Sequence, residues 1–193
     1  MAYKGISRDR IVEAARELLE RDGLGGFSLR TLAASLGVRV SSLYNHIDGQ
    51  EELLTTLGLR GVDELCAALE TAVAGKRRDV ALFALGRAYR DFARAHPQLY
   101  RLIMGAHGLR LPALEESVTR ISGPIFRLVE DYGIDGTAGI HAQRLLRSVM
   151  HGFYAHEQLG SFTLAEADRE ESYRFALESV AAQFERMGGE GQA

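Results

Sequence analysis

The chain has 193 residues, of which 46% are hydrophobic and 25% are charged, a composition typical of a globular protein with one or two domains. A single cysteine excludes an internal disulfide framework, and the lack of a leader pattern or of a run of about 18 apolar residues predicts a cytoplasmic protein without membrane segments. The formal net charge of −3 does not exclude nucleic-acid binding, which depends on the local field at the docking face.

Helical spacing dominates the sequence. Ala, Leu, Glu and Arg recur at intervals of three and four, strand-like alternation is rare, and only 3 prolines interrupt the pattern. These features predict an all-α chain of about nine helices. The first helix is expected over about residues 8–22, with Ser7 as its N-cap and the glycines after Asp22 at its end.

The stretch from Ser28 to Leu53 has the spacing of a helix-turn-helix, in which two short helices meet across a turn of a few residues. The residues that share a buried face in its first helix are Leu29, Leu32, Ala33 and Leu36. Gly37 follows where this helix must stop, because glycine enters the left-handed conformation without steric cost. Leu43 and Ile47 lie four apart and face the core, so the polar residues around them form an outer face suited to a nucleic-acid groove.

A long helix over about residues 50–73 links this N-terminal part to the rest of the chain without a flexible linker. Within it, Cys66 shares a face with Val62 and Leu69, which favours a buried inert thiol over a redox sensor. The later helices are expected over about residues 79–95, 97–104, 112–131, 137–160 and 165–187.

Gly123-Pro124 lies in the middle of the helix expected over residues 112–131. Proline removes a helix hydrogen bond and clashes with the preceding turn, which predicts a kink or break at this dipeptide. The break is either a weak point in a helix that moves or a simple means of fitting the helix around the core.

The two last helices carry apolar stripes broad enough to pack within the subunit and also against a second copy. The stripe of the first is formed by Leu145, Val149, Gly152, His156 and Leu159. The stripe of the second is formed by Tyr173, Leu177, Val180, Phe184 and Met187.

Three segments resemble the DNA-binding domain of the tetracycline-repressor (TetR) family, namely RIVEAARELLERDG, FSLRTLAASLGV and SSLYNHIDGQEELL. HPQLYRLIM and LLRSVMHGFYAHEQLGSF are similar to parts of the ligand-binding region of many members. The resemblance implies a transcription regulator rather than an enzyme, usually a repressor, that leaves a palindromic DNA operator when a small effector binds. It implies a helix-turn-helix domain over residues 1–52 and a helical effector-binding and dimerisation domain over 53–193, without cofactor. The homodimer would form through the two C-terminal helices.

Carried over position by position, the resemblance assigns roles in DNA binding. Contacts with the sugar-phosphate backbone are implied for Ser28, Arg30, Tyr44 and Gln50, and a position near a phosphate for His46. Positions facing the groove are implied for Arg39, Val40, Ser41, Ser42 and Asn45. The alternative for the whole set is a solvated helix face. Gln50 stands where the family typically has lysine, which predicts a shallower salt dependence unless Arg30 or Arg39 compensates.

An effector cavity is expected among the linking helix, the helix after it, the kinked helix and the first terminal helix. The residues expected to line it are Phe83, Tyr89, Phe92, Tyr100, Met104, Phe126, His151 and Tyr154. Each could instead be an ordinary core residue, because aromatic and methionine side chains at helical spacing usually pack. As a set they predict a largely apolar effector with one or two polar anchors. The histidines lack a recognised metal spacing, so no metal is expected.

Effector binding is expected to move the linking helix and change the separation of the two recognition helices, which must lie about 34–36 Å apart to enter successive major grooves. Two other functions stay open. One is a constitutive helix-turn-helix DNA-binding protein or helical adaptor without effector. The other is a small helical enzyme using His151, Tyr154 and Glu157, although the sequence supplies neither an activated nucleophile nor a phosphate loop.

Overall fold

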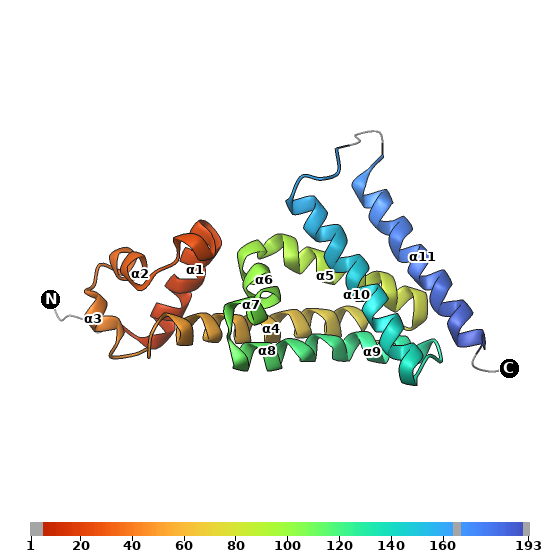
Figure 1. The fold of residues 1–193 in the computed structure, drawn as a ribbon, viewed down its shortest axis with the longest axis horizontal. Coiled ribbons are helices and arrows are strands. Elements are labelled where there is room, and N and C mark those ends of the chain that lie inside the picture. The colour runs from red at the N-terminus through yellow and green to blue at the C-terminus, as the bar shows by residue number, and fades with distance from the viewer. Residues whose placement is uncertain (1–5, 164–166, 191–193) are drawn as a thin grey trace. The chain divides into compact units, whose positions relative to one another are not determined.

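A computed structural model describes residues 6–163 and 167–190, which form α-helices, one 3₁₀ turn and no strand (Figure 1). The helices are α1 (Arg8–Gly26), α2 (Leu29–Leu36), α3 (Val40–Leu43), α4 (Gln50–Val73), α5 (Arg78–Ala95), α6 (Pro97–Met104), α7 (Ala106–Leu109), α8 (Pro112–Val118), α9 (Ser122–Asp131), α10 (Gly136–Gln158) and α11 (Arg169–Glu190). The all-α fold with an N-terminal helix-turn-helix is therefore confirmed.

The helices pack into two compact units. The first contains residues up to Glu64 together with His96–Thr119, and the second contains Leu65–Ala95 together with residues from Arg120 onward. Helix α4 contributes to both units. The predicted domains, residues 1–52 and 53–193, divide the chain by function rather than by packing, and that boundary stays a prediction.

The helix-turn-helix buries the face that the sequence predicted. Leu29, Leu32 and Ala33 are buried, and Leu36 is half-buried. Leu43 and Ile47 are 0% and 3% exposed, so the inward face of the second helix is confirmed as well. These contacts leave the polar residues around α3 on the outside.

Helices α6 and α8 pack closely on α4 within the first unit, and two glycines of α4 make this approach possible. A Cβ atom on Gly61 would lie 2.9 Å from side-chain atoms of Leu99 and Ile103 on α6. A Cβ atom on Gly58 would collide with Leu114 on α8. The close approach makes α6 and α8 part of the same unit as the helix-turn-helix.

The second unit is built from α5, α9, α10, α11 and the end of α4. Its two C-terminal stripes face different surroundings. In α11, Tyr173, Leu177 and Phe184 are at most 5% exposed, so this stripe packs inside the subunit. In α10, Leu145 and Leu159 are 39% and 77% exposed. Only the α10 stripe therefore presents apolar surface outward.

The chain breaks earlier than predicted between α8 and α9. Helix α8 ends at Val118, a 3₁₀ turn occupies Thr119–Ile121, and α9 begins at Ser122. The expected break at Gly123-Pro124 was wrong by a few residues, because both lie in the first turn of α9. Proline is tolerated there, since the first N–H groups of a helix have no partner within it.

Candidate nucleic-acid interface and ligand groove

Helix α2 has well-defined ends that set the turn of the helix-turn-helix. Ser28 Oγ accepts a hydrogen bond from the Thr31 N–H at 3.1 Å, and Thr31 Oγ1 accepts one from the Ser28 N–H at 3.0 Å. This reciprocal capping box satisfies two N–H groups at the start of α2. At the other end Gly37 adopts φ 66°, and its N–H bonds to carbonyls of the last turn. Ser28, predicted to contact DNA, is thus already used in the cap.

The face around α3 carries most of the predicted DNA-contacting residues. Those that are exposed are Arg39, Ser41, Tyr44 and Asn45, and those that are half-buried are Val40, Ser42 and His46. Tyr44 is 57% exposed, which is a large solvent-facing area for an aromatic side chain. Gln50 is also exposed, as the first residue of α4. The structure therefore places these side chains where a partner could reach them.

Two groups of arginines in the first unit differ in their partners. Arg8, Arg16 and Arg60 join α1 to α4 through ion pairs with carboxylates of the other helix. Arg30 and Arg39 are exposed and form no ion pair within residues 6–163 and 167–190. Their charge is available to an outside anion, whereas that of the first group is already neutralised.

Arg8 holds the end of the recognition element in place, a role that the sequence did not reveal. Its Nη1 donates to the His46 carbonyl oxygen at 2.7 Å, and its Nη2 donates to Glu52 Oε1 at 2.5 Å. Burial opposes ionisation of Glu52, but hydrogen bonds from Arg8 and Thr56 hold the pKa of this carboxyl below its ordinary value. No local pattern predicts a contact across 38 residues.

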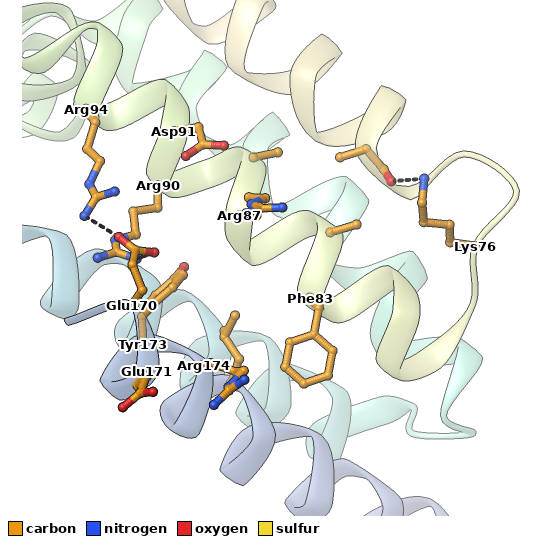
Figure 2. A pocket seen from close by; sticks show the side chains of 14 residues that line it. Lys76, Phe83, Arg87, Arg90, Asp91, Arg94, Glu170, Glu171, Tyr173 and Arg174 are labelled. Carbon is orange, nitrogen blue, oxygen red and sulfur yellow. Dashed lines mark hydrogen bonds and ion pairs between the residues drawn. The ribbon is translucent and has the colours of Figure 1, made fainter. Parts of the chain in front are cut away.

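A groove of about 1030 Å³ opens in the second unit beside α5, α11 and the end of α4 (Figure 2). Phe83 on α5 points toward α11, where Arg174 lies opposite it. Leu177 and small side chains of α5 supply further apolar wall. Arg87 also lines the groove; it is exposed and has no ion-pair partner among the described residues. The groove thus combines an aromatic surface with an available cation.

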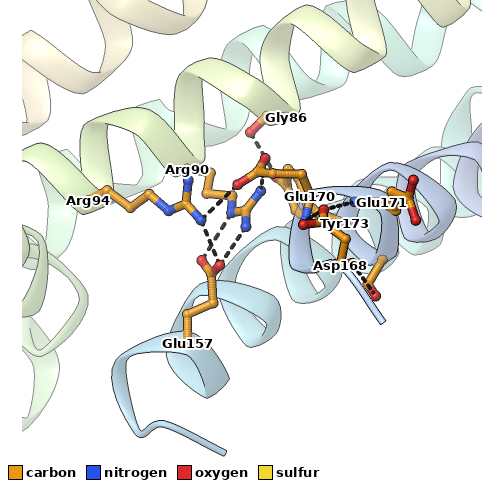
Figure 3. Close-up of polar contacts among 9 residues, drawn as sticks. Gly86, Arg90, Arg94, Glu157, Asp168, Glu170, Glu171 and Tyr173 are labelled. Carbon is orange, nitrogen blue, oxygen red and sulfur yellow. Dashed lines mark hydrogen bonds and ion pairs between the residues drawn. The ribbon is translucent and has the colours of Figure 1, made fainter. Parts of the chain in front are cut away.

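An ion-pair network centred on the buried pair Arg90 and Glu157 borders one end of this groove (Figure 3). The Arg90 side chain is 3% exposed and donates to both carboxylate oxygens of Glu157, at 2.5 and 3.0 Å, and to Glu170 at 2.8 Å. Its guanidinium lies 4.4 Å from the centre of the Tyr173 ring. Arg94 donates to the same two carboxylates, at 2.7 and 3.1 Å. The network ties α5 to α10 and α11.

The network also changes the protonation of Glu157. Burial raises the pKa of a carboxyl group, but the hydrogen bonds from Arg90 and Arg94 outweigh it and lower the pKa of Glu157. The carboxylate is therefore held ionised by two arginines. This engagement removes Glu157 from the enzymatic trio considered above, in which it would have to exchange protons with a substrate.

The eight predicted effector residues do not gather around the groove. Phe83 alone of the eight lines it. In the second unit, Tyr89, Phe92 and Tyr154 are buried, Phe126 is half-buried and His151 is exposed; in the first unit, Tyr100 is buried and Met104 is half-buried. A single cavity lined by all eight stays a prediction. The groove itself was missed, because only tertiary packing brings α11 beside α5.

Three other features were considered from the sequence. Cys66 is 8% exposed, in agreement with its expected burial. None of the helices in the described ranges is long and apolar enough to cross a membrane. Within the same ranges, no group of three histidine, cysteine or acidic side chains could hold a metal ion.

Comparison with known families gives two matches that cover different parts of the chain. Residues 11–57 match the family described as bacterial regulatory proteins, tetR family. Residues 82–180 match the family described as tetracyclin repressor-like, C-terminal domain. The first match contains the helix-turn-helix and the start of α4, and the second contains the ion-pair network and the groove residues from α5 and α11.

Individual proteins are similar over most of the chain. The HTH-type transcriptional regulator Rv0681 of Mycobacterium tuberculosis is 30% identical over 96% of this chain and 85% of its own. The HTH-type transcriptional regulator YobS of Bacillus subtilis is 34% identical over 77% and 78% of the two chains. The structure of SCO7222, a TetR regulator from Streptomyces coelicolor, superposes with a TM-score of 0.73 at 24% identity, covering 95% of this chain and 99% of that one.

Proposed function

Because the chain belongs to the TetR family of transcriptional regulators, with a helix-turn-helix DNA-binding domain, we propose that it is a repressor that binds a palindromic operator as a homodimer and is released by a small effector. Three parts of the molecule take part. They are the α3 face, the outer face of α10, and the effector region of the second unit.

On the α3 face, Arg39, Val40, Ser41, Ser42 and Asn45 face the major groove. Arg30, Tyr44, Gln50 and Ser28 contact the sugar-phosphate backbone, and His46 lies near a phosphate. The exposure of Tyr44 and the absence of internal ion pairs at Arg30 and Arg39, among the described residues, support these roles. Asparagine pairs well with adenine, and valine suits the methyl group of thymine, so Asn45 and Val40 carry base discrimination.

The homodimer forms through α10 and α11. Support comes from the outward apolar surface of α10, where Leu145 and Leu159 are exposed, and from Phe175 of α11, which is 70% exposed. The proposed pairing would join these exposed side chains into one contiguous apolar patch, the kind of surface that marks protein–protein contacts. A symmetric pairing of this face places two recognition elements on one operator.

The effector is a small, largely apolar molecule with a polar anchor. The groove supports this part of the proposal because Phe83, Ala84 and Ala88 offer apolar surface, and Arg87 offers a cation without an ion-pair partner in the described chain. Its volume lies near the upper end of the range usual for small-molecule sites. The buried residues Tyr89, Phe92 and Tyr154, with the other predicted positions, remain candidates for a cavity that opens on binding.

The exposed α3 face with its uncompensated arginines is the observation that carries the proposal. The test is selection of genomic DNA fragments that the full-length protein retains, followed by a screen of metabolites for release. We expect one enriched palindromic sequence and at least one releasing compound. Tyr44→Ala should weaken binding to all sequences alike, because its phosphate contact carries no base information.

The same screen distinguishes the alternatives. An enriched palindrome that no compound releases would support a constitutive DNA-binding protein. Retention of no DNA by a folded dimer would support an adaptor and contradict the repressor. A folded Tyr44→Ala variant with unchanged affinity would contradict the proposed docking of α3.

A further inference from the structure

The first turn of α6 lacks a cap of its own. Its N-cap residue, His96, makes no side-chain hydrogen bond to the helix, and the next residue, Pro97, has no N–H group. The N–H groups of Gln98 and Leu99 point out of the helix start and need acceptors from elsewhere. Buried or half-buried N–H groups of this kind are costly if they are left without one.

Glu20 of α1 supplies both acceptors. One of its carboxylate oxygens accepts from the Gln98 N–H at 3.1 Å and the other from the Leu99 N–H at 3.0 Å. A carboxylate at this position also interacts favourably with the positive end of the helix dipole. The cap therefore comes from a residue 78 positions earlier in the chain, in the first helix of the DNA-binding region.

The surrounding packing holds this contact closely. Gly23 of α1 adopts φ 66°, and a Cβ atom there would lie 3.1 Å from the side-chain oxygen of Gln98. A Cβ atom on Gly61 of α4 would lie 2.9 Å from the side chain of Leu99. The start of α6 thus lies against both α1 and α4, inside the first unit.

The chain connects the two units next to this cap. It crosses between them after Glu64, after Ala95 and after Thr119. The second crossing joins the end of α5, which lines the groove, directly to the capped turn of α6. The backbone that Glu20 caps is therefore covalently continuous with the end of α5.

We propose that Glu20 is a positioning residue that couples α6 to the DNA-binding helices. The hydrogen bonds of its carboxylate make α6 and α1 move together. A shift of α6 therefore reorients α1 and, with it, the recognition element. Without the cap, α6 can shift while α1 stays, and the orientation of the helix-turn-helix is less well defined. The protein would then bind its operator less tightly, because part of the binding free energy would be spent on ordering the less rigid helix-turn-helix.

The test compares full-length Glu20→Ala and Glu20→Gln with Glu17→Ala and Glu17→Gln. Glu17 is exposed on the same helix, so its variants lose the same charge without touching the cap. Amide hydrogen exchange of Gln98 and Leu99 should rise about 3- to 30-fold in Glu20→Ala and stay unchanged in Glu17→Ala. Glu20→Gln, which keeps one good acceptor, should lie between Glu20→Ala and the wild type.

The second measurement is affinity for an operator duplex obtained by the selection described above, and it rests on the proposed function. Glu20→Ala should bind at least threefold more weakly than Glu17→Ala. Equal affinity of the two folded variants would reduce Glu20 to a stabilising residue and overturn the coupling. Unchanged amide exchange in Glu20→Ala would overturn the cap itself. If no DNA is retained by any variant, the exchange measurement still decides the cap, and the failure belongs to the proposed function.

Discussion

Two groups of arginines in this regulator are used in opposite ways. In the helix-turn-helix, Arg30 and Arg39 are exposed and carry no ion pair in the part of the chain described. In the second unit, Arg90 is buried, lies over the rings of Phe153 and Tyr173, and is bound by Glu157 and Glu170. A charge that the fold has already neutralised stabilises the fold, whereas an uncompensated surface charge can act on a partner. Substitutions in the two places should therefore separate stability from DNA affinity.

The largest effect is expected for Arg90→Met, which keeps the apolar stem and removes the guanidinium. Glu157 would stay buried with Arg94 as its remaining partner, and the contact with the Tyr173 ring would be lost. Removing one partner of a buried pair costs about 3–5 kcal/mol where the other charge is left uncompensated, and because Arg94 remains we expect a loss near the lower end, about 3 kcal/mol. Chemical denaturation should show this decrease in the free energy of unfolding, while the DNA affinity of the folded fraction stays within twofold.

A double variant provides the control for this prediction. In Arg90→Met with Glu157→Leu no buried charge is left unpaired at these positions, so most of the lost stability should return. If the free energy of unfolding of the single Arg90→Met variant lies within about 0.5 kcal/mol of the wild-type value, the network contributes little to stability. The two groups of arginines would then differ only in their exposure to solvent.

Acid should weaken the second unit through the same carboxylate. The pKa of Glu157 is lowered in the folded state, so its contribution is fully present above the ordinary glutamate pKa of about 4.3 and is lost as the pH falls through the lowered folded value. We expect the free energy of unfolding to fall more steeply between about pH 5 and pH 3 in the wild type than in the double variant. Equal slopes would mean that other carboxylates govern acid unfolding.

The helix-turn-helix could be predicted from the sequence, whereas the contacts of Arg90 could not. Local signals identified the helix-turn-helix, because Ser28, Gly37 and the spacing of Leu43 and Ile47 act within a few residues. The exposed DNA-facing positions followed from that pattern and from the family resemblance. Contacts between distant residues could not be predicted in this way. The Arg90 network and the Glu20 cap join residues that are 63 to 80 positions apart in the sequence.

The groove and the interruption between α8 and α9 were also predicted only in part from the sequence. Phe83 was identified as a candidate, but its partners on α11 were not, since nothing in the sequence aligns α5 with α11. The break near Gly123-Pro124 was placed a few residues late because proline is compatible with the first turn of a helix. The Gly123-Pro124 dipeptide predicted that a break exists, and the structure places it at Thr119–Ile121.

A smaller effect is expected for Arg30→Gln. If Arg30 contacts a phosphate, its loss should weaken operator binding about fivefold at 0.15 M salt and make the slope of log affinity against log salt shallower by about 0.9. The free energy of unfolding should change by less than about 0.5 kcal/mol, because the side chain is exposed. Arg87→Gln is the matched control: it removes an exposed arginine from the other unit and should leave effector-free DNA binding unchanged.

The smallest change is expected for Gln50→Lys, which adds a charge where none is present. Gln50 is exposed at the start of α4, so lysine should fit without cost to folding, although it opposes the helix dipole slightly. If a phosphate lies beside this position, operator affinity should rise up to about fivefold, and the salt slope should steepen by up to about 0.9. Fluorescence anisotropy titrations at several salt concentrations measure both quantities. An unchanged salt slope would place position 50 away from the DNA backbone. A steeper salt slope without tighter binding would show that the charge of the added lysine does contact a phosphate, but that repulsion from the helix dipole cancels the gain in binding free energy.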